Sequence, residues 1–190
     1  SNYEILVEAQ QVLGIKDALA KLGVEYDKVQ NSAAMRSPYS DKNEESGTCV
    51  FAPMLCIYEE YDFPVLFTLF EYIGQEHLGV DSIVVRAGDY KYQYGIKDFV
   101  KLGSEEQKIK NRTVAVEYGV RVATDYDYNM FMDILSSKES IVRFSRLYHG
   151  EFACQDYTIT NEDRQAITDV INAYNLMCSV SPEVMRKALA

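Results

Sequence analysis

The side chains best suited to nucleophilic, redox or metal chemistry are four cysteines and two histidines: Cys49, Cys56, Cys154, Cys178, His77 and His149. No two cysteines have the Cys-x-x-Cys spacing of zinc or redox sites. Two histidines without a His-Glu-x-x-His motif are few for a zinc centre. A Cys–His catalytic pair requires a proximity that local sequence does not show, and we expect both histidines in exposed loops.

The four cysteines leave two interpretations open. Four cysteines allow three pairings, and in an oxidising compartment Cys49–Cys56 and Cys154–Cys178 are the pairs to test. Each cysteine also lies among apolar residues, so all four could equally be buried free thiols.

The segment Asp125 to Asn129 places side-chain oxygens at positions 1, 3 and 5 of a calcium-loop pattern. Met130 then stands where the sharp turn requires Gly, and Ser136 stands where a bidentate Glu is required. We therefore interpret these acidic residues as the cap of a helix.

A phosphate-binding loop is also excluded. Gly74 and Gly79 have the right spacing, but Val80 and Asp81 stand where Lys and Ser/Thr are needed. The chain has no Gly-x-Gly-x-x-Gly and no Gly-x-Ser-x-Gly motif. The sequence thus predicts no catalytic residue, no cofactor site and no metal site, and we expect a protein that is not an enzyme.

One dense acidic cluster, Glu59, Glu60 and Asp62, lies beside aromatic residues. It could bind a cation or a basic peptide, or it could be a solvated loop end between two strands. The whole chain is acidic, with 19 basic and 29 acidic residues and a net charge of −10. This balance disfavours nucleic acids and anionic membranes, and it permits a basic protein partner.

The elements that would position these residues are clearest between residues 140 and 177. Residues 141–146 alternate as a strand, and 152–159 is a second strand after the turn at Gly150. Thr160 is a candidate N-cap for an amphipathic helix that extends to Met177. We expect this helix to pack on the sheet that contains Phe144.

The rest of the chain predicts a mixture of strands and helices. We expect strands at 65–73, 96–102 and 112–123, a hairpin at 82–94, a charged turn or short helix at 104–110, and a helix at 125–136. Residues 5–22 predict two short helices or one kinked helix. The abundance of tyrosine, 15 residues without any Trp, favours a β-rich fold.

These patterns predict an α+β protein: an antiparallel β-rich body with a packed C-terminal amphipathic helix and a small N-terminal helical segment. We expect the helical segment in residues 1–30, a flexible linker or loop in 31–48, and an α+β domain in 49–190. No apolar run reaches the ~18 residues that a transmembrane helix needs. The chain starts at Ser1 without Met and without a signal-like segment, so a targeting peptide that had been removed would not be visible in this sequence.

The end of the chain resembles a known group of proteins. The pattern is Val-Arg-Phe at 142–144, Asp-Tyr-Thr-Ile-Thr at 156–160, and Gln-Ala-Ile-x-x-Val-x-x-Ala-Tyr at 165–174. It is similar to the C-terminal end of a loose group of secreted bacterial lipoproteins, chiefly from Gram-positive species. The resemblance implies an extracytoplasmic, non-enzymatic domain, and it implies no site residues.

Two functional hypotheses follow. The first is an extracytoplasmic, surface or lipoprotein-like binding or accessory module for an unknown protein or small ligand. The second is a cytoplasmic acidic interaction or inhibitor protein, of the immunity type, that binds a basic partner through the Glu59–Asp62 cluster. An enzyme with a Cys or His nucleophile is a third possibility without local support.

Overall fold

The structure is a computed structural model that describes the backbone of residues 1–190 and every side chain except that of Lys101. Its ten strands form two antiparallel sheets. The larger sheet has six strands, in the spatial order β1 (Gly23–Asp27), β2 (Ser32–Arg36), β3 (Val50–Tyr58), β4 (Val65–Gly74), β8 (Arg112–Val122) and β7 (Lys101–Ile109).

The smaller sheet has four strands, in the order β10 (Ala153–Thr158), β9 (Ser140–Arg146), β5 (Ser82–Ala87) and β6 (Tyr90–Gly95). The predicted hairpin at 82–94 is confirmed as β5–β6, with Gly88 in its turn at a positive φ of 58°. A short 3-10 helix, η1 (Ile96–Asp98), follows β6 where we expected the start of a strand. The predicted α+β fold with a β-rich body is confirmed.

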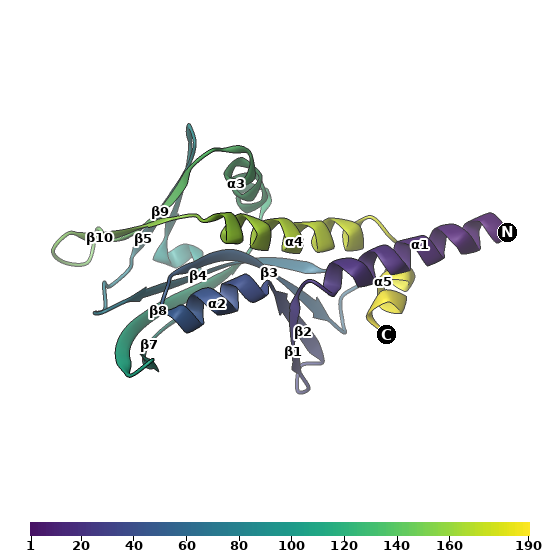
Figure 1. Ribbon diagram of the computed structural model, residues 1–190, viewed down its shortest axis with the longest axis horizontal. Helices are drawn as coiled ribbons and strands as arrows, with labels where there is room; N and C mark the ends of the chain where they lie inside the picture. The colour runs from purple at the N-terminus through teal and green to yellow at the C-terminus, as the bar shows by residue number, and fades with distance from the viewer.

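Five α-helices accompany the sheets (Figure 1): α1 (Asn2–Leu19), α2 (Pro38–Ser46), α3 (Asp125–Ser136), α4 (Asn161–Cys178) and α5 (Pro182–Leu189). The predicted cap of α4 is confirmed, since Thr160 Oγ accepts a hydrogen bond from the backbone N–H of Asp163 at 3.1 Å. Figure 1 shows α1 continuing away from the body, with α5 beneath it. None of the helices within the described part of the chain has the length and apolar character needed to cross a membrane.

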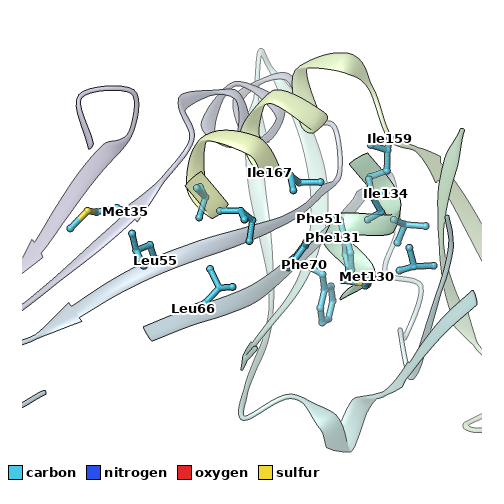
Figure 2. Packing of buried hydrophobic residues seen from close by; sticks show 14 of the residues in the cluster. Met35, Phe51, Leu55, Leu66, Phe70, Met130, Phe131, Ile134, Ile159 and Ile167 are labelled. Atoms are coloured by element: carbon cyan, nitrogen blue, oxygen red, sulfur yellow. The ribbon is translucent and has the colours of Figure 1, made fainter. Parts of the chain in front are cut away.

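Helix α4 packs chiefly on β3 of the larger sheet and against α1. We expected α4 to pack on the sheet that contains Phe144, which is the smaller sheet. The main partner of α4 is instead a strand of the larger sheet, so this prediction was wrong in that respect. The reason is that α4 closes one core shared by both sheets, in which Phe144 and Ile167 are both fully buried. Figure 2 shows Phe51 and Leu55 of β3 beneath Ile167, with Phe131 and Ile134 of α3 beside them. Each large apolar side chain buried here contributes about 1.5–3 kcal/mol to folding.

The segment 31–48 is not the loop that we predicted. It contains β2 and α2, and β2 pairs with β3 so that Met35 lies opposite Leu55 in the core. Helix α2 is polar because it buries little of its surface, but its boundaries follow ordinary rules: Ser37 caps it, Pro38 begins it and Gly47 ends it at a φ of 75°. Strands from residues 1–30 and 31–48 thus belong to the same sheet as the body.

Three smaller expectations also change. One helix, α1, covers the region in which we expected two short helices or a kinked one; it ends at Leu19, and Gly14 does not break it. The charged stretch 104–110 belongs to edge strand β7 as far as Ile109, and this strand exposes most of its described side chains and so carries no apolar alternation. Helix α5 was missed because it is short, although Ser181 and Pro182 mark its beginning.

A buried carboxylate, Asp127, links the two sheets. It accepts hydrogen bonds from Thr68 of β4 at 2.8 Å and from the Tyr94 hydroxyl of β6 at 3.0 Å. The backbone N–H of Thr124 donates to it at 2.9 Å, and the Arg121 guanidinium lies 3.2 Å away. The prediction that the acidic residues at 125–129 cap a helix is therefore confirmed.

Candidate functional site

All four cysteines are free thiols. Cys49 directly precedes β3 and Cys56 lies within it. Side chains alternate along an extended chain, and an odd number of positions separates the two residues, so their thiols lie on opposite faces of the sheet. Cys154 lies on β10 and Cys178 at the end of α4, and both are exposed. The suggested pairings are therefore not formed, and the alternative of four buried thiols holds only for Cys49 and Cys56.

The buried thiols are poor nucleophiles. Burial raises the pKa of Cys49 and raises that of Cys56 to about 11, so both stay protonated at neutral pH. Cys49 is also held by the backbone of Ile73, whose N–H lies 3.4 Å from its sulfur.

The two histidines lie in exposed loops, as predicted. The Nδ1 atom of His77 is 3.4 Å from Ser104 Oγ, and that of His149 is 2.9 Å from the buried carboxylate of Asp81. Asp81 also accepts hydrogen bonds from the backbone N–H groups of residues 147–149, at 2.7–3.0 Å. Its role is therefore to shape the turn between β9 and β10. Among the described residues, no group of three or more His, Cys, Asp or Glu is arranged to hold a metal ion.

A surface cleft of about 890 Å³ lies between the ends of the two sheets and is lined mainly by polar side chains. Cys49 and His77 both line it, but no hydrogen bond between them is present in the described part of the chain. We therefore do not assign a nucleophile–base pair to this cleft.

A second cleft, of about 440 Å³, lies between the β1–β2 hairpin and α5, and we call it the hairpin cleft. Its size falls within the range of about 300–1,000 Å³ that is usual for ligand pockets. Its lining is mainly apolar and includes Leu19, Val24, Tyr26, Ala33, Met35, Ile57, Tyr58, Met185, Ala188 and Leu189.

The wall formed by α5 is fixed at three places. Met185 is almost fully buried and joins α5 to the core. Lys187 forms an ion pair with Glu8 of α1, and Arg186 forms one with Asp62 at 2.8 Å. The acidic loop that the sequence singled out is therefore next to the cleft.

The rim of the hairpin cleft is polar. Asp27 accepts hydrogen bonds from the N–H groups of Val29 and Gln30 and so shapes the hairpin turn. Asn31, at a φ of 47°, donates its side-chain amide to Glu59 at 2.6 Å. The Glu59–Asp62 cluster is exposed at the end of β3, as one of its two interpretations predicted.

A third cleft, of about 420 Å³, lies on the opposite face of the larger sheet, and we call it the sheet-face cleft. Its lining is Gly23, Val24, Glu25, Ala34, Arg36, Asp41, Met54, Leu69 and Glu71. Val24 contributes to both this cleft and the hairpin cleft, because β1 is the outermost strand and separates them.

Arg36 is the centre of the charges in the sheet-face cleft. Its Nε atom donates to Asp41 at 2.7 Å and its Nη2 atom donates to Glu44 at 2.9 Å. Glu71 lies 3.5 Å from Nη1, and its other oxygen is buried without a hydrogen-bond partner. Burial, and then the neighbouring Glu44 charge, raise the pKa of Glu71 to about 7. Burial also acts to raise the pKa of Glu44, but the hydrogen bonds to Arg36 and Glu71 and the Arg36 charge together outweigh it, and the net shift is downward.

Sequence reasoning found only the acidic rim of this region. Both walls of the hairpin cleft come from elements that were not predicted: the β1–β2 hairpin and α5. Two local signals could have revealed these elements. Ser181 and Pro182 are typical of a helix start, and Asn31 is a turn residue between the two short strands β1 and β2.

Comparison of the chain with family models, with curated proteins and with solved structures gives no match. The resemblance to secreted lipoproteins therefore stays a prediction.

Proposed function

We propose that this protein is a non-enzymatic binding module and that the hairpin cleft is its ligand site. The observation that carries the proposal is an apolar cleft of ligand size with a polar rim, built on the rigid floor of β2 and β3. The raised pKa values of the buried thiols support a binding role over covalent catalysis.

The ligand class follows from the lining. Apolar side chains form the floor, so the ligand must bring an apolar group of matching size. The rim holds two cationic side chains: Arg186, which is already paired with Asp62, and the exposed Lys28. We place the module outside the cytoplasm, as the lipoprotein resemblance implies, in a binding or accessory role.

Methionine methyl groups give a direct test of this site. Met35 and Met185 line the hairpin cleft, whereas Met130 is fully buried away from it. In a protein labelled with ¹³C at the methionine methyls, indole at millimolar concentration should shift the first two signals and leave the third unchanged. Absence of any shift at Met35 and Met185 with a series of small aromatic probes would overturn the proposal.

A matched pair of variants sharpens the test. Tyr26→Ser removes an exposed aromatic ring from the cleft wall, and Tyr90→Ser removes another exposed ring from edge strand β6. Because one aromatic contact is worth about 0.5–1.5 kcal/mol, we expect Tyr26→Ser to weaken indole binding about two- to tenfold. Tyr90→Ser should leave it unchanged.

The alternative is an acidic interaction protein that binds a basic partner. It is favoured by the net charge of −10 and by the exposed Glu59–Asp62 cluster. The salt dependence of binding separates the two candidate functions. Dissolved ions screen charges, so salt weakens binding to a charged rim but not to an apolar floor. Binding to a basic probe such as polylysine that disappears at high salt, together with no indole binding, would favour the alternative.

A further inference from the structure

Strand β1 is an open edge between two clefts. It pairs only with β2 in the sheet, and all five of its residues are exposed. Figure 1 shows the β1–β2 hairpin projecting from the body, away from α4. Every second residue of an edge strand turns its N–H and C=O away from its neighbour, and these groups can pair with another extended chain.

The two faces of β1 lead to different clefts. Val24 and Tyr26 lie opposite Met35 and Ala33, so they belong to the face of the hairpin cleft. Glu25 lies opposite Ala34 and belongs to the face of the sheet-face cleft. Because side chains alternate along a strand, a strand added beside β1 would direct successive side chains toward the two clefts in turn.

We propose that β1 binds an extended segment of a partner protein as an added strand, with apolar side chains toward the hairpin cleft and basic side chains toward the sheet-face cleft. This inference rests on the proposed binding function and specifies its partner. In such complexes the main-chain hydrogen bonds supply affinity, and pockets for alternate side chains supply specificity.

The basic character of the ligand follows from the charges beside β1. Glu25 is exposed on the strand itself. Asp41 lies beside the first residue of the strand, since a Cβ atom at Gly23 would lie 3.8 Å from its Oδ2 atom. Oδ1 of Asp41 is held by Arg36, and Oδ2 has no hydrogen-bond partner within the described residues. A lysine or arginine of the ligand would therefore meet two carboxylates at this face.

The same charges argue against a second copy of this chain as the occupant. Antiparallel pairing of two β1 strands would place Glu25 and Asp27 of one copy near the same residues of the other. Like charges across a strand pair are destabilising, and each chain carries a net charge of −10. The edge is therefore protected from self-pairing and remains open to a basic strand.

The test uses the full chain and a synthetic peptide of alternating Lys and Val with capped ends. We expect it to shift the methyl signals of Met35 and Met185 in the hairpin cleft and of Met54 in the sheet-face cleft. The free amides of β1 should gain at least about tenfold protection from hydrogen exchange on binding. A peptide with Glu in place of Lys should not bind.

Two controls isolate strand addition. A peptide with N-methyl groups along its pairing edge keeps its side chains but loses its donors, and we expect at least about tenfold weaker binding. Glu25→Lys should weaken binding of the Lys peptide about three- to tenfold, since exposed ion pairs are worth up to about 1 kcal/mol and this change reverses the sign. Glu105→Lys, on the other edge strand β7, should have no effect.

The outcomes separate this inference from the binding function itself. If the Met35 and Met185 signals shift but the N-methylated peptide binds equally well, the cleft binds ligands and strand addition is refuted. If neither peptide nor indole shifts any methionine signal, both proposals fall. If β1 amides become protected without peptide, as the protein concentration rises and a dimer forms, the occupant is a second copy and the peptide proposal is refuted.

Discussion

Replacing Asp127 with alanine is expected to lower the free energy of unfolding by about 3–5 kcal/mol. The carboxylate is fully buried and accepts from Thr68, Tyr94 and both the N–H and the hydroxyl of Thr124. At about 1 kcal/mol net for each hydrogen bond, these four contacts account for most of that loss. The remainder comes from Arg121, whose guanidinium would keep its charge without its partner.

Arg121 makes a second variant informative. Its side chain is mostly buried, and its Nε atom has no hydrogen-bond partner in the described part of the structure. Arg121→Met in the background of Asp127→Ala removes the unpaired charge, so the double variant should be more stable than the sum of the two single losses predicts. A coupling of about 1–3 kcal/mol is expected for groups in direct contact.

The assay is equilibrium unfolding in urea at neutral pH, followed by circular dichroism. Asp125→Ala is the control, because Asp125 lies in the same first turn of α3 but is exposed. The free energy of unfolding of this control should fall by less than about 1 kcal/mol, which is the stabilisation that a carboxylate gives at a helix N-terminus. A loss for Asp127→Ala no greater than for this control, or a coupling of zero with Arg121, would refute the reasoning.

Three further predictions concern single side chains. Because the pKa of the Glu71 carboxyl is raised to about 7 in the folded state, the folded state holds more protons than the unfolded state between about pH 4.5 and 7. The free energy of unfolding of the wild-type protein should therefore fall as the pH rises through this window, by at most about 1.4 kcal/mol per pH unit. Urea unfolding at a series of pH values measures this dependence, and Glu71→Gln should abolish it. Burial acts to raise the pKa of Asp81, but its hydrogen bonds to the backbone of residues 147–149 and to the His149 side chain together outweigh this, and the net shift is downward. Asp81→Asn should thus destabilise the protein above the unfolded pKa of Asp and converge with wild type at more acid pH, and hydrogen exchange at the His149 amide should follow the same trend. Iodoacetamide should modify the exposed Cys154 of the native protein well before the buried Cys49, as mass spectrometry of timed samples would show, and equal rates would contradict the burial of Cys49.

The parts of the fold that could be predicted are those whose side chains face the core with a regular period. The helix beginning after Thr160 and the strand around Phe144 each bury one complete face, so their periodicity appears in the sequence. Strand β2 has only five residues, among them Ala33 and Ala34, and its place in the sheet depends on pairing with β3. Local propensity does not contain that information.

The candidate site was not predictable for the same reason. Its walls are a short hairpin and a short helix, and residues such as Met185 meet Met35 only because α5 docks against α1 and the core. No motif links these positions along the chain. The acidic loop at Glu59 was visible because charge is a local property, but its position at the rim of a cleft is a tertiary one.

The pairing order of the strands has a consequence for how the chain folds. Strand β4 pairs with β8, and β5 pairs with β9, so both sheets join segments that are distant in sequence. The larger sheet is complete once Val122 has been synthesised, yet the helix that covers β3 arrives only with residues 161–178. Such non-local pairings are slow steps in folding, because the entropy of closing a long loop is lost before the contacts form. A nascent chain that ends before α4 would therefore expose to solvent the apolar face of β3 that α4 covers, and such exposed surface favours aggregation during synthesis.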